Sequence, residues 1–80
     1  MSEPLVGERL KNAIKVERAR HNLTQDQLAS LVKVTRKTIN TIENGVFIPS
    51  TVLAIKLARA LRLPVEELFW LEANDTTSEG

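Results

Sequence analysis

Two short amphipathic segments separated by only two residues constrain the fold of this 80-residue chain more than any other feature. The segments run from Gln25 to Val32 and from Thr35 to Asn44, and only Lys33 and Val34 lie between them. Their apolar residues recur at helical spacing, Leu28, Ala29, Leu31 and Val32 in the first segment and Ile39 and Ile42 in the second. So short a connection forces two helices to cross steeply. The pattern therefore predicts a helix-turn-helix unit rather than an antiparallel hairpin.

The ends of these two helices carry local signals of their own. Thr24 with Gln27 forms the T-x-x-Q pattern of a capping box, and the hydroxyl of Thr35 can cap the second helix. The pair Asn44 and Gly45 tolerates the left-handed conformation that ends a helix. Where the helices cross, a residue larger than Ala29 would force them apart at a cost of roughly 1–3 kcal/mol.

Three further helices are expected, which makes the fold class all-α. The first runs from residue 12 to residue 21, buries Ile14 with Val16 and Ala19, and ends at Asn22 in the left-handed conformation. The fourth runs from 51 to 61 after a Ser50 cap, and the fifth runs from Pro64 to residue 69. The fourth helix supplies further core residues, namely Leu53, Ile55, Leu57, Ala58 and Leu61.

The two terminal segments are expected to lie outside the folded domain. Residues 1–8 are expected to be flexible, residues 9–71 to form the domain, and residues 72–80 to form a polar, disordered tail. Residues 9–11 could also pair with residues 70–72 as a short two-stranded β-ribbon. Phe69, Trp70 and Leu71 form an apolar run too large to be buried entirely in so small a domain, so we expect them to contact a second copy of the chain. In the alternative reading, Trp70 folds back over the core of its own chain.

Composition and charge narrow the possible functions. The sequence has no cysteine, which excludes disulfides and thiolate metal sites, and it has neither a membrane-length apolar run nor a signal-peptide pattern, so we expect a soluble cytoplasmic protein. The net charge of +1 conceals a strong asymmetry. Residues 9–42 hold eight Lys or Arg against two acids, whereas residues 63–80 hold five acids and no base. One end of the molecule can therefore meet a polyanion, although ordinary solvated faces would give the same pattern.

Several stretches of the sequence closely resemble the Cro/C1-type (XRE) helix-turn-helix family, especially its small stand-alone regulators. They are LTQDQLA, VTRKTINTIENGVFIPS, LAIKLARAL and VEELFW, and the similarity spans about residues 10–71. The resemblance implies a five-helix, phage-repressor-like DNA-binding domain that acts as a homodimeric transcriptional regulator. It also implies a structural ion pair between Arg18 and Glu43. The family often has Gly where Asn22 and Lys33 stand, because both positions favour the left-handed conformation.

The second helix of the unit carries the candidate DNA-reading residues Arg36, Lys37, Asn40 and Thr41. Arg and Lys suit guanine O6 and N7, Asn suits adenine N6 and N7, and the methyl group of Thr suits the thymine methyl. The resemblance supports Arg36, Lys37 and Thr41 most directly. The expected phosphate and supporting contacts are Gln25, Lys33, Thr35, Thr38 and Asn44. The function expected is sequence-specific recognition of double-stranded DNA at an inverted-repeat operator, with repression as the outcome.

The sequence disfavours an enzyme and leaves one other alternative to DNA binding. An enzyme is not expected, because His21 is the only histidine and the sequence has no nucleophile with a base at useful spacing and no Gly-rich phosphate loop. No cofactor, metal or small-molecule ligand is expected either. An antitoxin or another protein-interaction module could use the same fold. Against that alternative, the polar tail of residues 72–80 is short for wrapping a partner protein.

Overall fold

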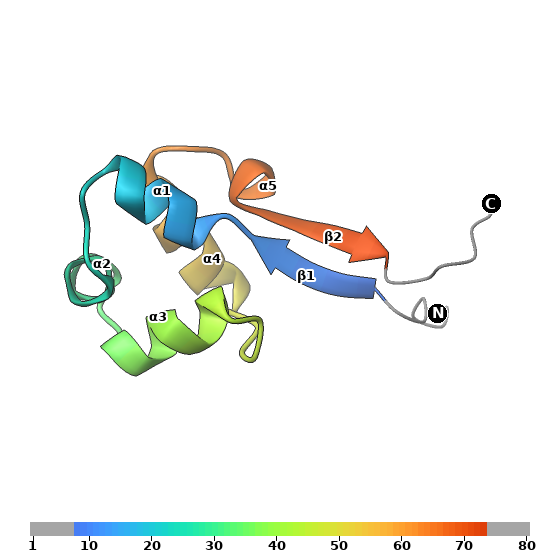
Figure 1. The fold of residues 1–80 in the computed structure, drawn as a ribbon, viewed down its shortest axis with the longest axis horizontal. Helices are drawn as coiled ribbons and strands as arrows, with labels where there is room; N and C mark the ends of the chain where they lie inside the picture. The colour runs from blue at the N-terminus through green and yellow to red at the C-terminus, as the bar shows by residue number, and fades with distance from the viewer. Residues whose placement is uncertain (1–7, 74–80) are drawn as a thin grey trace.

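Within residues 8–73, five helices form the body of the fold, and a two-stranded antiparallel ribbon projects from it (Figure 1). The computed structural model describes residues 8–73. In chain order the elements are β1 (Glu8–Asn12), α1 (Ile14–Arg20), α2 (Gln25–Val32), α3 (Arg36–Glu43), α4 (Thr51–Leu61), α5 (Val65–Leu68) and β2 (Phe69–Ala73). The predicted fold class is confirmed, including the ribbon from the terminal segments. No helix within residues 8–73 is both long and apolar enough to cross a membrane.

The ribbon has the predicted pairing and is longer than predicted. Arg9 lies opposite Glu72 and Lys11 opposite Trp70, and the pairing extends one residue further at each end. The ribbon therefore includes Glu8, Glu72 and Ala73, which the sequence analysis placed in the terminal segments. The remainder of those predicted segments, residues 1–7 and 74–80, lies outside the described residues.

Two helix boundaries were predicted wrongly because the ribbon claims their residues. Asn12 ends β1 instead of starting a helix, and its Oδ1 accepts a hydrogen bond from the Ile14 backbone N–H at 3.1 Å. Phe69 leaves α5 in an extended conformation and pairs with Asn12 across the ribbon. Pairing between distant segments thus overrides the local helical pattern at both positions.

The core lies where α1, α2, α3, α4 and α5 meet. Its fully buried side chains are Ile14, Leu28, Ile39, Ile42, Leu57, Leu61 and Leu68. Burial of each large apolar side chain stabilises the fold by roughly 1.5–3 kcal/mol. Val16, Ala19, Leu31 and Ile55 are exposed, contrary to prediction. The buried stripe on each short helix is narrower than its apolar residues alone indicate, because only one side of each helix has a neighbour to pack against.

The predicted caps and turns hold the helix-turn-helix unit in shape. The Thr24 hydroxyl accepts from the Gln27 N–H at 3.0 Å, and the Gln27 side chain accepts from the Thr24 N–H at 2.8 Å, which completes the capping box. Thr35 caps α3 in the predicted way by accepting from the Thr38 N–H. Lys33 takes the left-handed conformation with φ 61°, so the two-residue turn forms without glycine.

Candidate nucleic-acid interface

Helix α3 has one buried side and one exposed polar side. Ile39 and Ile42 are 0% and 1% exposed, which anchors the helix in the core. Arg36, Lys37 and Asn40 are exposed. The predicted base-reading residues therefore gather on the outward side of a helix whose inward side is fixed by packing.

The hydroxyls of the α3 cap residue Thr35 and of Thr38 and Thr41 within α3 make local hydrogen bonds. Thr41 Oγ1 donates to the backbone carbonyls of Lys37 and Thr38, both at 3.0 Å. The hydroxyls of Thr35 and Thr38 lie 3.1 Å apart and form a hydrogen bond. Since the Thr41 hydroxyl is occupied by its own helix, its methyl group is the part of the side chain left for an apolar contact.

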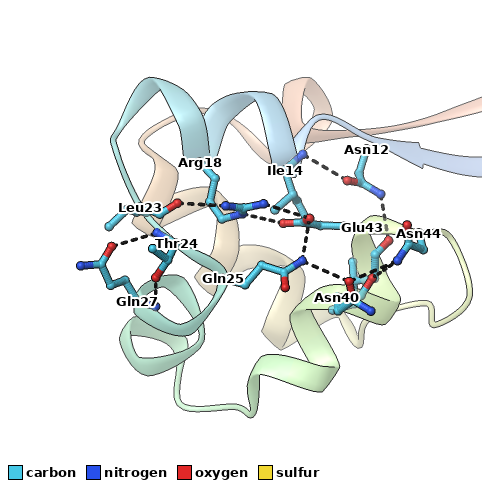
Figure 2. A network of polar contacts seen from close by, with 11 residues as sticks. Asn12, Ile14, Arg18, Leu23, Thr24, Gln25, Gln27, Asn40, Glu43 and Asn44 are labelled. Carbon is cyan, nitrogen blue, oxygen red and sulfur yellow. Dashed lines mark hydrogen bonds and ion pairs between the residues drawn. The ribbon is translucent and has the colours of Figure 1, made fainter.

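An ion pair joins α1 to the end of α3 (Figure 2). Arg18 Nε donates to Glu43 Oε2 at 2.7 Å and Nη2 donates to Oε1 at 3.2 Å, which is a two-point pairing. The side chains of Arg18 and Glu43 are 16% and 6% exposed. Arg18 Nη1 also donates to the Leu23 carbonyl at 3.0 Å, so the predicted structural pair ties α1, the loop before α2 and α3 together.

Three amide side chains continue from this ion pair across the outward side of α3. Gln25 Nε2 donates to Glu43 Oε1 at 3.1 Å and to Asn40 Oδ1 at 3.2 Å. Asn44 Nδ2 donates to the Asn40 backbone carbonyl at 2.9 Å and to Asn40 Oδ1 at 3.3 Å (Figure 2). Gln25 and Asn44, predicted as supporting residues, thus contact a predicted reading residue directly.

One residue that positions this site was missed from the sequence, and a second residue makes an unpredicted link elsewhere in the fold. Asn12 Nδ2 donates to the Ile42 carbonyl at 3.0 Å and so links the ribbon to the last turn of α3. His21 Nε2 lies 2.9 Å from the Leu61 carbonyl and links the end of α1 to the end of α4. Neither residue belongs to a periodic pattern, so the only available signal was an isolated polar residue next to an element boundary.

The charges of the site are free to meet an anion. Within residues 8–73, the ion pairs are Lys11 with Glu72, Arg18 with Glu43 and Arg20 with Glu17, so Lys33, Arg36 and Lys37 have no acidic partner there. Lys33 also lines a shallow hollow with three cations that the sequence reasoning did not select, Lys56, Arg59 and Arg62. The described His, Asp and Glu side chains form no cluster of three or more that could hold a metal ion.

Comparison with known proteins agrees with this geometry. The sequence model of a family described as helix-turn-helix matches residues 14–68. The chain is 43% identical over 63 residues to YgzD of Bacillus subtilis, named as an uncharacterized HTH-type transcriptional regulator, and the match covers 79% of this chain and 96% of that protein. MJ0272 of Methanocaldococcus jannaschii, another protein named as an uncharacterized HTH-type transcriptional regulator, is 42% identical over 66 residues, covering 82% and 100%. The crystal structure of the restriction-modification controller protein C.AhdI from Aeromonas hydrophila matches with a TM-score of 0.65 and 34% identity over 70% of this chain and 81% of that one. The chain belongs to the Cro/C1-type (XRE) helix-turn-helix family of DNA-binding transcriptional regulators.

Proposed function

We propose that this protein binds a specific double-stranded DNA operator as a homodimer and represses transcription there. The observation that carries the proposal is the exposed polar side of α3, which presents Arg36, Lys37 and Asn40 while Ile39 and Ile42 fix the opposite side in the core. A helix held in this way fits the major groove of B-DNA with its N-terminal residues at the base edges.

In this arrangement the side chains divide into readers and supports. Arg36 and Lys37 donate to guanine O6 and N7, and the Thr41 methyl packs on a thymine methyl. The remaining polar residues contact DNA phosphates or position the base-reading side chains. They are Gln25, Lys33, Thr35, Thr38 and Asn44. Repression follows because a dimer bound across an operator blocks access to that DNA by other proteins.

The homodimer is supported by exposed apolar side chains next to α3. We define the loop patch as Val46, Phe47, Ile48, Val52 and Ile55, which lie in the α3–α4 connection and the first half of α4 and are all exposed. Several large exposed apolar residues within one short stretch of chain favour an association surface there. Phe69 is 7% exposed and belongs to the core, so of the predicted interface only Trp70 and Leu71, 42% and 62% exposed, can contribute.

The position of the loop patch sets the expected operator. The α3–α4 connection directly follows α3, so an interface at the loop patch brings the C-terminal ends of the two α3 helices close to the two-fold axis. Two recognition helices in successive major grooves lie about 34 Å apart. The operator is then an inverted repeat with half-sites about one helical turn apart. A footprint over a single unrepeated half-site would contradict this arrangement.

The DNA-binding proposal is tested by selecting bound duplexes from a random pool and measuring affinity for the selected site. We expect log affinity to fall linearly with log salt, with a slope of several units. Arg36→Ala should relax preference at one base pair by roughly 1–3 kcal/mol, whereas Lys33→Ala should weaken all sequences alike. Failure of the folded protein to enrich any sequence, or affinity insensitive to salt, would refute the proposal.

The dimer is tested by sedimentation equilibrium of charged variants. Ile48→Glu places a carboxylate in the loop patch and should shift the protein to monomer, while Leu71→Glu tests the ribbon in the same way. Circular dichroism establishes that each variant is folded. If Leu71→Glu separates the subunits and Ile48→Glu does not, the ribbon and not the loop patch forms the interface.

A further inference from the structure

The amides of Gln25, Asn40 and Asn44 form a short chain whose two ends are groups that can only accept hydrogen bonds. At one end is the Glu43 carboxylate, which is paired with Arg18. At the other end is the backbone carbonyl of Asn40. Because neither end can donate, each neighbouring amide must turn its NH₂ group toward it.

These two ends determine the orientation of the amide between them. Gln25 must present Nε2 to Glu43 at 3.1 Å, and Asn44 must present Nδ2 to the Asn40 backbone carbonyl at 2.9 Å. Both NH₂ groups also meet the same side-chain atom of Asn40, at 3.2 and 3.3 Å. That atom must be the oxygen Oδ1, since a rotated Asn40 amide would set three NH₂ groups against one another.

The orientation leaves different atoms free on the outward side of α3. A carbonyl oxygen has two lone pairs, and both of those on Asn40 Oδ1 are used by Gln25 and Asn44. In the part of the chain that the structure describes, Asn40 Nδ2 and Gln25 Oε1 have no hydrogen-bond partner. Asn40 is exposed, so its NH₂ group is a donor available to a ligand (Figure 2).

We infer that Gln25 and Asn44 are positioning residues that make Asn40 a hydrogen-bond donor only, so that Asn40 prefers guanine or thymine to adenine. The inference rests on the proposed function, because it concerns which base α3 reads. An unconstrained Asn binds adenine with its oxygen accepting from N6 and its NH₂ donating to N7. Here both lone pairs of Asn40 Oδ1 already accept hydrogen bonds, from Gln25 and Asn44. The NH₂ group suits guanine O6 and N7 or thymine O4. At adenine it can donate only to N7 and lies beside the donor N6, and at cytosine it meets the donor N4.

The same chain of contacts connects base choice to the ion pair that holds the fold. Glu43 Oε1 accepts from both Arg18 Nη2 and Gln25 Nε2, so the carboxylate that ties α1 to α3 also orients Gln25. Gln25 in turn orients Asn40. Arg18 holds Glu43 through two hydrogen bonds of its own. Removal of Gln25 and Asn44 together should therefore release the Asn40 amide and leave the ion pair in place.

The first experiment compares base preferences by competition binding on the operator selected for the full chain. Asn40→Ala identifies the base pair that Asn40 contacts as the one whose preference it abolishes. At that pair we expect the unmodified protein to prefer guanine or thymine over adenine by about 5- to 150-fold, the range of one good side-chain reading contact. The double variant Gln25→Ala with Asn44→Ala should shift the preference toward adenine. Lys33→Ala is the matched control, because it should weaken binding without changing the ratio.

The outcomes of this experiment separate the two proposals. Adenine preference in the unmodified protein, no change in any preference with Asn40→Ala, or an unchanged ratio in the double variant would each overturn the role of Asn40 while leaving DNA binding intact. Enrichment of no sequence at all would overturn the proposed function, and this inference with it. Thermal unfolding of each variant establishes that loss of binding is not loss of fold.

A second experiment needs no DNA. Side-chain NH₂ hydrogens that are bonded inside a protein exchange with water more slowly than free ones. By NMR we expect the Gln25 and Asn44 NH₂ hydrogens to exchange more slowly than those of Asn40, and Asn40→Ala to remove much of the protection at Gln25. The opposite order would mean that the Asn40 amide is rotated and would overturn the inference.

Discussion

The ion pair between Arg18 and Glu43 offers the sharpest test of how α3 is held. Glu43→Ala removes the carboxylate and leaves the guanidinium of Arg18, which is 16% exposed, with only the Leu23 carbonyl as a partner. Breaking a buried pair by removing one member costs about 3–5 kcal/mol, because the remaining charge is left uncompensated. Since some water reaches Arg18, we expect the lower end, a loss of roughly 3 kcal/mol in the free energy of unfolding.

A loss of that size is large for a domain of this length. At roughly 0.05–0.15 kcal/mol per residue, the stability of the whole domain is only about 3–10 kcal/mol. Each kcal/mol moves the midpoint of thermal unfolding by about 4–8 °C in so small a domain, so Tm should fall by roughly 12–24 °C. Urea unfolding followed by circular dichroism measures the free energy, and a temperature scan measures Tm.

The control variants separate the charge from the packing. Replacing both residues, as in Arg18→Met with Glu43→Leu, should cost less than Glu43→Ala alone, because no unpaired charge remains. Glu43→Gln keeps the shape and removes the charge, and it should fall between the two. A Glu43→Ala loss below about 0.5 kcal/mol, typical of an exposed pair, would refute the reasoning. So would a double Arg18→Ala and Glu43→Ala variant whose loss equals the sum of the single losses.

Three further variants test the supports around the helix-turn-helix unit, each by urea unfolding. Ala29→Leu should cost roughly 1–3 kcal/mol, because Ala29 is 3% exposed where α2 packs in the core, and the exposed Leu31→Ala is the control that should change little; equal effects would contradict the packing. Thr24→Ala should cost about 1 kcal/mol by removing the capping box of α2, and an unchanged midpoint would mean that water replaces the cap. His21→Ala should cost roughly 0.5–1.5 kcal/mol by removing the hydrogen bond to the Leu61 carbonyl, and a variant as stable as the parent would count against that bond.

The sequence correctly predicted the caps and turns, whose structure depends on one short stretch of chain. The capping box at Thr24, the hydroxyl cap at Thr35 and the left-handed turns at Asn22 and Lys33 all occur as expected. These features depend on hydrogen bonds between residues no more than five apart. Their energies are therefore largely independent of the rest of the fold.

The wrong predictions concern residues whose structure depends on segments far away in the sequence or on how many neighbours pack against a helix. Asn12 and Phe69 were assigned to helices, yet each pairs with the other across the ribbon. Val16 and Leu31 were expected in the core and are exposed. Apolar spacing predicts the direction of a buried stripe, but the width of the stripe depends on how many neighbours pack against the helix.

The candidate site is likewise only partly predictable from the sequence. The residue types of Arg36, Lys37, Asn40 and Thr41, and their position on one helix, can be read from the sequence, because a period of 3.6 residues separates an outward side from Ile39 and Ile42. The orientation of Asn40 cannot be read in this way. It depends on Gln25 from another helix and on a carboxylate that Arg18 holds from a third.

The helix-turn-helix unit, its caps and the residues on its exposed face can all be predicted from the sequence, since they depend on short-range geometry and helical periodicity. The packed fold was needed to show that Val16 and Leu31 are exposed, that Phe69 belongs to the core, and which atoms of the polar residues remain free. Burial and hydrogen-bond saturation depend on neighbouring side chains, and here those neighbours come from α1, α2 and β1 and not from α3 itself.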